Sequence, residues 1–269
     1  MSLLDSLIAS RANIENLAED WLNEYDSDSR GSFLRIISLI FQTCGLTQNV
    51  PPSVFEVGWV NFVKALEISL SPSALSTYPI IDKRKNLGKQ ISRNVCDFIG
   101  MIFSKAEDVV LHDGIFVNEL CELLHVLTKS SLRAFRHTAT LIVVKMITHL
   151  SKIAKNLSLQ YSRIDRQLSN CEQEQSRGRS SAMRESLENL LATSGLRISE
   201  LEEKIHFLIS VVLPKRFRDV FISIRSLCLE ELEVWLLRYP NAFMGHKNLK
   251  YLGWALSDPC IMMRQKSIQ

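Results

Sequence analysis

The amino-acid sequence predicts an all-α fold, and three observations lead to that prediction. Apolar residues recur at intervals of three and four along most of the chain, which is the spacing of one face of an α-helix. No long stretch alternates apolar and polar residues, as a half-buried β-strand would. Glycine (10) and proline (7) are scarce among the 269 residues, so connections are few and helices are long.

The first 130 residues are predicted to form successive helices separated by short breaks. They are expected at residues 14–25, 33–44, 55–70, 85–103 and 116–127. Ser53 and Glu56 have the spacing of a capping box, which predicts the start of the third of these helices. Successive helix pairs without a repeating sequence template are typical of an irregular α-solenoid of HEAT-like helical pairs.

Residues 131–213 differ from the rest because their apolar spacing is heptad-like, as in the seam of a coiled coil. The expected seam comprises Leu150, Ile153, Leu157, Tyr161, Ile164, Leu168 and Cys171, then Met183, Leu187, Leu190, Ser194, Ile198, Leu201, Ile205, Leu208 and Val212. A polar stretch at 172–181 separates the two arms, and Pro214 is expected to end the second. We therefore predict a long protruding antiparallel helical hairpin, with arms of roughly 45 Å or more.

The remaining residues are predicted to return to shorter helices. Helices are expected at about 216–239 and 248–256, and Asp258-Pro259 is a start signal for another. That helix runs to the last residue, so we expect the sequence to be a fragment cut inside a helical pair. The predicted division is 1–130 for the N-terminal helical pairs, 131–213 for the hairpin and 214–269 for the start of a further domain.

Composition and motifs exclude several functional classes. A net charge of +3 is too small to indicate nucleic-acid binding without local clustering. The six cysteines occur singly, and phosphate-binding loops, nucleophile elbows and zinc-protease motifs are absent from the sequence. We therefore expect no enzyme, no catalytic residue, no metal, no cofactor and no small-molecule substrate. The apolar stretches 33–41 and 139–150 are too short to span a bilayer, so no membrane partner is expected.

Three local clusters favour structural roles over chemical ones. Arg133, Arg136 and His137 lie at a predicted helix start, where cations oppose the macrodipole and need partners, so we interpret them as structural. Cys121 and His125 are half of a possible metal site with no second pair, so core packing is favoured. The basic, serine-bearing hairpin tip at 177–181 is interpreted as a solvated turn, with DNA contact, partner contact or phosphorylation as alternatives.

Several segments resemble the stromalin (stromal antigen) subunits of cohesin. The run 130–141, S-S-L-R-A-F-R-H-T-A-T-L, contains the R-A-F-R-H-T segment of that family. The other similar segments, in chain order, are 21–25, 31–34, 41–45, 78–79, 96–99, 217–219, 224–225, 228–232, 239–243 and 249–254. Those from 217 onward resemble the start of the stromalin conservative domain. The matches keep their order over nearly the whole chain.

The resemblance implies a HEAT-like scaffold subunit of cohesin, located in the nucleus on chromosomes and without catalytic activity. Family members bind the kleisin subunit, double-stranded DNA and cohesin regulators that carry short aromatic motifs, and they act in sister chromatid cohesion. The chain would be the N-terminal part of a longer subunit, with most of the kleisin-binding surface further along. The alternative is an unrelated α-solenoid adaptor for protein–protein interaction.

The resemblance also suggests a DNA-binding surface. The densest basic cluster is Lys83, Arg84, Lys85, Lys89 and Arg93. The last three are four apart and would share a helical face able to meet successive phosphates. The family carries a basic pair just before the segment 96–99; Lys89 fits that place best, and Gln90 departs from it. The alternative is an ordinary solvated helix surface.

A second surface is implied for partner peptides at Phe217, Arg218, Lys250 and Trp254. In the family the corresponding residues form an exposed patch that receives short aromatic motifs. Trp254 would be a flat apolar anchor, and the two cations would engage carboxylates or aromatic rings. Phe217 replaces the usual tyrosine. The alternative is that Phe217 and Trp254 are core residues.

Overall fold

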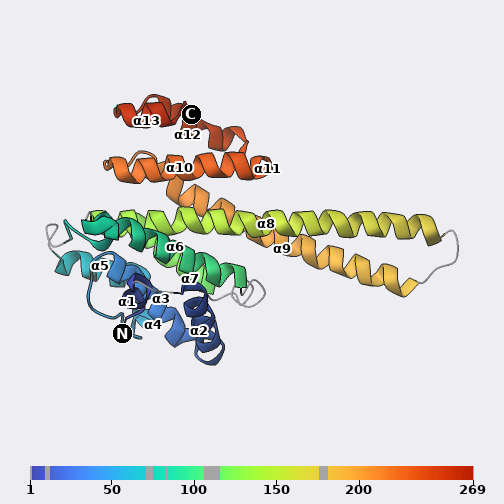
Figure 1. Ribbon diagram of the computed structural model, residues 1–269, viewed down its shortest axis with the longest axis horizontal. Coiled ribbons are helices and arrows are strands. Elements are labelled where there is room, and N and C mark those ends of the chain that lie inside the picture. The colour runs from blue at the N-terminus through green and yellow to red at the C-terminus, as the bar shows by residue number, and fades with distance from the viewer. Residues whose placement is uncertain are drawn as a thin grey trace.

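The computed structural model describes residues 2–9, 13–70, 75–82, 84–105, 116–175 and 181–268, and among these it contains helices and no strand. The predicted all-α class is therefore confirmed. The helices stack in layers, and a two-helix hairpin projects far beyond them on one side (Figure 1). This shape is the predicted solenoid with a protruding hairpin.

The elements follow one another along the chain as helices of very different length. The first part contains α1 (Leu3–Ile8), α2 (Ile14–Ser27), α3 (Ser29–Thr43), α4 (Val54–Val57), α5 (Trp59–Ser69), the 3-10 turns η1 (Pro79–Ile81) and η2 (Arg84–Asn86), α6 (Leu87–Lys105) and α7 (Phe116–Thr128). The second contains α8 (Arg133–Gln175), α9 (Ser181–Arg216), α10 (Ile222–Arg238), α11 (Pro240–Phe243), α12 (His246–Leu256) and α13 (Ile261–Lys266).

The helix predicted at 55–70 is in fact two helices, because Gly58 adopts a φ of 79° between α4 and α5. A positive φ is accessible to glycine at little cost, and it lets the chain change direction there. The predicted capping box is not formed. Ser53 already has helical backbone angles (φ −60°, ψ −12°) and its side chain makes no capping hydrogen bond, whereas a capping residue needs extended backbone.

The core of the N-terminal part is an aromatic cluster centred on Phe116. Its ring lies 5.4 Å from that of Trp21 and 5.5 Å from that of Phe33. The Trp21 indole is buried, and its Nε1 donates a hydrogen bond to the Ser32 carbonyl at 2.9 Å. Such tilted and edge-to-face aromatic pairs add stabilisation beyond burial, so this cluster fixes α2, α3 and α7 against one another.

The hairpin is rooted in the solenoid and exposed toward its tip. The first turns of α8 bury Phe135, Ile142 and Met146 between the neighbouring layers. The predicted seam is largely correct, since Leu157, Leu187, Leu201, Ile205, Leu208 and Val212 are buried. Met183 and Leu190 are instead 61% and 51% exposed, so those two assignments were wrong. Leu187, which lies between them in sequence, is buried. Helix α9 also continues past Pro214 and ends at Arg216.

A repeated arginine contact holds the turns that precede α8, α10 and α13. Arg136 Nη1 donates to the carbonyls of Ser130 and Ser131, Arg225 Nη1 to those of Asp219 and Val220, and Arg264 Nη1 to those of Asp258 and Pro259. In every case the acceptors lie six and five residues before the arginine. The three turns share one geometry despite different sequences, as expected for successive repeats of a solenoid.

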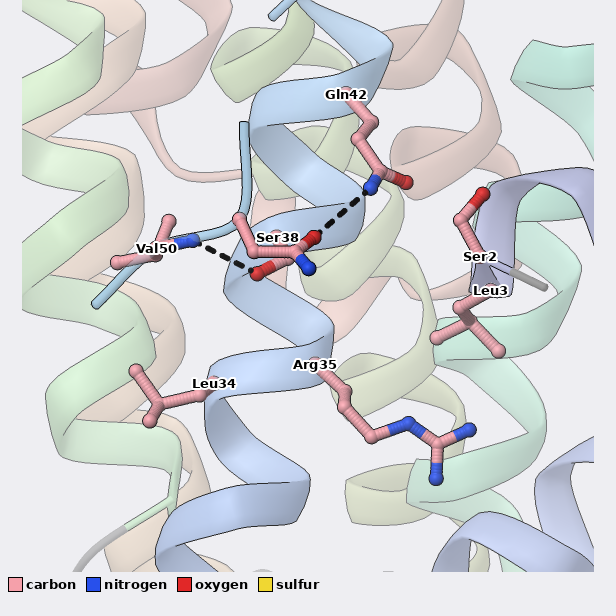
Figure 2. Close-up of a pocket in the computed structure, with 8 residues that line it drawn as sticks. Ser2, Leu3, Leu34, Arg35, Ser38, Gln42 and Val50 are labelled. Atoms are coloured by element: carbon pink, nitrogen blue, oxygen red, sulfur yellow. Dashed lines mark hydrogen bonds between the residues drawn. The ribbon is translucent and has the colours of Figure 1, made fainter. Parts of the chain in front are cut away.

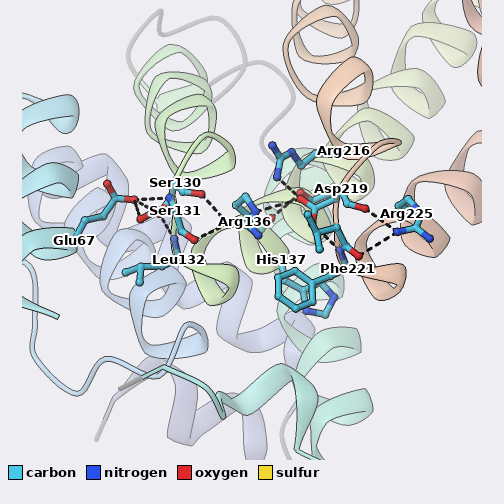
Figure 3. A network of polar contacts seen from close by, with 12 residues as sticks. Glu67, Ser130, Ser131, Leu132, Arg136, His137, Arg216, Asp219, Phe221 and Arg225 are labelled. Carbon is cyan, nitrogen blue, oxygen red and sulfur yellow. Dashed lines mark hydrogen bonds and ion pairs between the residues drawn. The ribbon is translucent and has the colours of Figure 1, made fainter. Parts of the chain in front are cut away.

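Carboxylates join these turns into a continuous Arg–Asp ladder, formed by Arg136, Arg216, Asp219, Arg225, Asp258 and Arg264. Figure 3 shows its first part, from Arg136 to Arg225. Asp219 Oδ2 accepts from Arg136 Nε at 3.1 Å and from Arg216. Asp258 accepts from Arg225 Nε at 2.7 Å and Nη2 at 2.9 Å. Burial disfavours the Asp258 carboxylate, but the hydrogen bonds from Arg225 and the Cys260 amide prevail and lower its pKa.

The structural interpretation of the cations near the start of α8 is confirmed by these contacts. Arg136 is a rung of the ladder, and Arg133 places its guanidinium 4.2 Å from the Phe221 ring centroid. His137 is buried, with its Nδ1 2.7 Å from the Tyr78 hydroxyl. Burial and the nearby Arg133 charge lower the pKa of His137 to about 4, so its imidazole is neutral in the folded protein at pH 7.

His137 makes stability depend on pH in a defined window. Its pKa is about 4 in the folded chain and 6.5 ordinarily, so the unfolded chain binds more protons between these values. The free energy of unfolding should fall by up to about 3 kcal/mol as the pH drops from about 6.5 to 4, because of this group. Above pH 7, His137 should contribute no pH dependence. Urea unfolding at pH 7.5, 5.5 and 4.5 measures this. The His137→Gln variant should show a smaller pH dependence; identical slopes would contradict the assignment.

Candidate peptide-binding and DNA-binding surfaces

The structure brings three of the four predicted peptide-binding residues into one exposed cluster. Lys250 and Trp254 lie four residues apart on α12, so they share a helical face. Arg218 comes from the turn after α9, and its Cζ lies 3.8 Å from the Trp254 ring centroid. Lys250 Nζ lies 5.7 Å from the same centroid. Arg218 and Lys250 are exposed and the indole is half-buried. We call Arg218, Lys250 and Trp254 the tryptophan cluster.

Phe217, the fourth predicted residue, does not belong to the exposed cluster. Its side chain is only 6% exposed and stacks on Tyr251, with centroids 4.7 Å apart and rings 9° from parallel. Tyr251 in turn contacts Trp254 edge-on at 5.2 Å. Phe217 is therefore a core residue that packs beneath the cluster, as the alternative interpretation of this residue expected. Tyr251 was missed, although its place three residues before Trp254 on α12 is a helical-spacing signal.

The Arg–Asp ladder fixes the turn that presents Arg218. Arg216 and Asp219 flank this residue and are both buried, joined to each other by an ion pair. Asp219 Oδ1 also accepts a hydrogen bond from the Phe221 amide at 3.0 Å. With its neighbours held on both sides, the Arg218 backbone has little freedom. The guanidinium can therefore stay over the indole without a large entropy cost on binding.

The tryptophan cluster has the chemistry of a small peptide-binding surface. A tryptophan flanked by two cations offers an apolar face for an aromatic or aliphatic side chain and donors for an adjacent carboxylate. Aromatic residues and arginine are the residue types that dominate the binding energy of protein interfaces. The cluster contains no acid, so a partner with an acidic residue next to an aromatic one suits it best.

The predicted basic surface is only partly assembled. Lys83 lies outside the described residues. Arg84 is exposed, but its guanidinium is paired with Asp82 (Nη2–Oδ2 2.6 Å), and this pair lowers the pKa of the Asp82 carboxyl. Lys85 lies in η2, before α6 begins at Leu87. The prediction that Lys85 shares a helical face with Lys89 and Arg93 was therefore wrong.

Lys89 and Arg93 form the part of the basic surface that agrees with the prediction. Both are exposed on α6, four residues apart on one face. Neither makes an ion pair with any residue that the structure describes. Two adjacent cations of this kind can replace the counterions of successive phosphates. We call Lys89 and Arg93 the α6 basic pair.

The structure places no candidate metal centre in the part of the chain that it describes. It brings together no group of three or more metal-ligating side chains in those residues. Burial raises the pKa of the Cys121 thiol to about 12, which is unfavourable for a metal ligand. Within the described ranges, every helix is too short or too polar to cross a membrane. Residues 177–180 of the hairpin tip lie outside the described residues.

A small cavity of about 240 Å³ opens between α1 and α3, away from both surfaces in sequence (Figure 2). Polar groups in its wall hydrogen-bond to one another: the Val50 amide donates to Ser38 Oγ at 3.2 Å, and Gln42 Nε2 lies 3.5 Å from Asn49 Oδ1. The one charged residue in its lining, Arg35, is paired with Glu24. The cavity therefore has the character of a packing groove between helices.

Comparison with known proteins assigns the chain to a family. Residues 76–190 match the STAG domain, and residues 218–269 match the stromalin conservative domain. The chain is 29% identical to "Cohesin subunit SA-3" of Homo sapiens over 99% of its length and 22% of that protein. It is 25% identical to "Cohesin subunit psc3" of Schizosaccharomyces pombe over 96% of its length and 27% of that protein.

The fold agrees with the same assignment. The solved structure of "Cohesin subunit Scc3 from Z. rouxii" superposes with a TM-score of 0.87, over 100% of this chain and 32% of that one, at 22% sequence identity. The relatives are named as subunits of a complex, which agrees with the prediction that the chain is not an enzyme. The chain spans about a fifth to a quarter of the length of these curated relatives. The STAG domain precedes the stromalin conservative domain along the chain, and the chain belongs to the stromalin family.

Proposed function

We propose that this chain is part of a cohesin scaffold subunit that acts in sister chromatid cohesion in the nucleus. The observation that carries the proposal is the serial match of this chain to a STAG domain and a stromalin conservative domain, together with relatives that are named as cohesin subunits. A rigid solenoid of this kind holds separate binding surfaces at fixed positions, as a scaffold requires. An unrelated adaptor scaffold has no specific observation in its favour.

A cellular experiment tests this role. Acute depletion of the intact protein, in cells that express it, should let sister chromatids separate before anaphase. Re-expression of the protein should restore pairing in chromosome spreads. Sister chromatids that stay paired after complete depletion would contradict the proposal.

Within this role, we propose that the α6 basic pair contacts double-stranded DNA. Lys89 and Arg93 are exposed, adjacent and without carboxylate partners among the described residues. The Arg84 guanidinium donates two hydrogen bonds to the Asp82 carboxylate (Nε–Oδ1 3.1 Å, Nη2–Oδ2 2.6 Å), so a phosphate would have to compete with that carboxylate for Arg84. The contact would be sequence-independent and sensitive to salt.

The double variant Lys89→Gln/Arg93→Gln should bind DNA more weakly and with a lower salt dependence. Loss of two phosphate contacts should reduce the slope of log K against log [salt] by about 2. Fluorescence anisotropy of a labelled 20-base-pair duplex across a salt series measures this. Arg84→Gln should have a smaller effect, since its charge is already engaged by Asp82, and Arg163→Gln on the exposed hairpin is the matched control. An unchanged slope in the double variant would exclude this surface.

We propose that the tryptophan cluster receives a short aromatic motif of a cohesin regulator, with the cations engaging a neighbouring carboxylate. The proximity of Arg218 and Lys250 to a half-buried indole supports this assignment. We place kleisin among the partners of the whole subunit rather than on these residues, because the family resemblance assigns most of that contact to later parts of the chain.

A further inference from the structure

A cavity of about 490 Å³ lies at the root of the hairpin, where α8 and α9 leave the solenoid and meet the end of α10 and the start of α11. Its volume is within the range of ligand-binding pockets. The apolar part of its lining comprises Ala154, Leu159, Ile205, Ile209, Pro240 and Ala242, of which Ile205 and Ile209 are buried. These residues belong to neither the tryptophan cluster nor the α6 basic pair.

One polar group in the wall of this cavity lacks a partner. Ser151 is only 4% exposed, and its Oγ makes no hydrogen bond to any described residue. One turn earlier on the same helix, Thr148 Oγ1 is satisfied by the Val144 carbonyl at 3.1 Å and by Glu231 at 2.8 Å. A buried hydroxyl without a partner is unfavourable, so a ligand that supplies a donor or acceptor at this depth would be stabilised.

The rim of the cavity is predominantly basic. Lys155 Nζ donates to the Arg238 carbonyl at 2.9 Å and lies 5.6 Å from the Tyr239 ring centroid, which holds it beside the end of α10. Arg238 is exposed and has no ion-pair partner among the described residues. His206 lies on the same rim, and Glu202 is the one carboxylate in the lining. The two permanent cations also lie at a helix C-terminus, where they complement the dipole.

We propose that this cavity binds an acidic peptide segment of a partner protein. An apolar side chain of the segment enters between α8 and α9, with a hydrogen-bonding group within reach of Ser151, and flanking carboxylates pair with Lys155 and Arg238. Charge complementarity selects the acidic peptide, and burial of its apolar side chain against the aliphatic residues of the lining supplies the driving force. A DNA backbone is a poorer match, because its phosphates cannot fill the apolar part of the cavity.

The test is a selection from a random 12-residue phage-displayed peptide library on the intact protein, with counter-selection on Ala242→Trp. Ala242 is exposed on α11 and lines the cavity, so the larger side chain should fill the space without disturbing the core. The selected peptides should share acidic residues next to an apolar one. Failure to enrich such peptides over the filled variant, or enrichment of basic or uncharged ones, would overturn the proposal.

A selected peptide, labelled with fluorescein, then gives the specificity of the site. Its dissociation constant should rise at least about tenfold in Ala242→Trp and about fivefold in Arg238→Gln. Arg163→Gln on the exposed part of α8 is the matched charge control and should bind like the wild type. Ser158→Tyr is a second filling variant, used if Ala242→Trp unfolds at a lower temperature. Peptide binding that survives both filling variants, or is displaced by a 20-base-pair duplex, would contradict the assignment.

Discussion

Asp219→Ala should lower the free energy of unfolding by about 3–5 kcal/mol, the cost of removing one partner from a buried charge cluster. The Asp219 side chain is 2% exposed and bonds Arg136, Arg216 and the Phe221 amide. Without this carboxylate, two largely buried guanidinium groups lose their common counter-charge. Urea unfolding at pH 7.5 measures the loss.

The control for this prediction is Asp165→Ala. Asp165 is exposed on the hairpin, and its carboxylate makes no ion pair with a described residue. Its removal should change stability by less than about 0.5 kcal/mol. If Asp219→Ala were no more destabilising than this control, the ladder would not hold the turns together as its geometry indicates.

Trp254→Ala should weaken binding of an aromatic–acidic peptide at least about 30-fold, since a central tryptophan is worth about 2 kcal/mol or more. The probe is a fluorescein-labelled Gly-Ser-Phe-Asp-Phe-Gly-Ser peptide, measured by anisotropy. Arg218→Gln and Lys250→Gln should each weaken binding by about fivefold, because each cation is exposed and screened.

Phe207→Ala is the matched control for the tryptophan prediction. Phe207 is 46% exposed on α9 and belongs to no part of the cluster. This variant should bind the probe like the wild type. A probe that binds Trp254→Ala and wild type equally would show that the indole is not the anchor, and the circular dichroism melt of each variant separates lost binding from lost folding.

The fold class and the hairpin were predictable because periodicity reports burial along a helix directly. The seam was correct where both arms pack closely, as at Leu201 and Leu208, and wrong at Met183 and Leu190 near the tip. Heptad spacing gives the direction of a side chain, but the separation of the two helices decides whether that side chain is covered. The break at Gly58 was missed because a single glycine does not show from sequence whether its φ is positive.

The candidate surfaces were predictable only where the residues share one helical face. Lys250 and Trp254 share a helix, so their common face follows from spacing alone. The burial of Phe217 on Tyr251 depends on how the turn after α9 meets α12, which local sequence does not encode. The Arg–Asp ladder was also missed, although Asp219 with Arg225 and Asp258 with Arg264 repeat one six-residue spacing.

The measurement that tests the central claim most directly is the amount of kleisin recovered with the intact protein. The tagged protein would be purified from cells that express it, and kleisin would be quantified against the bait by mass spectrometry. Membership of cohesin predicts kleisin in near-stoichiometric amount, with no loss in Trp254→Ala because kleisin is assigned elsewhere on the subunit. Kleisin no more abundant than with an unrelated nuclear bait would contradict the claim that this stromalin chain serves as a cohesin scaffold.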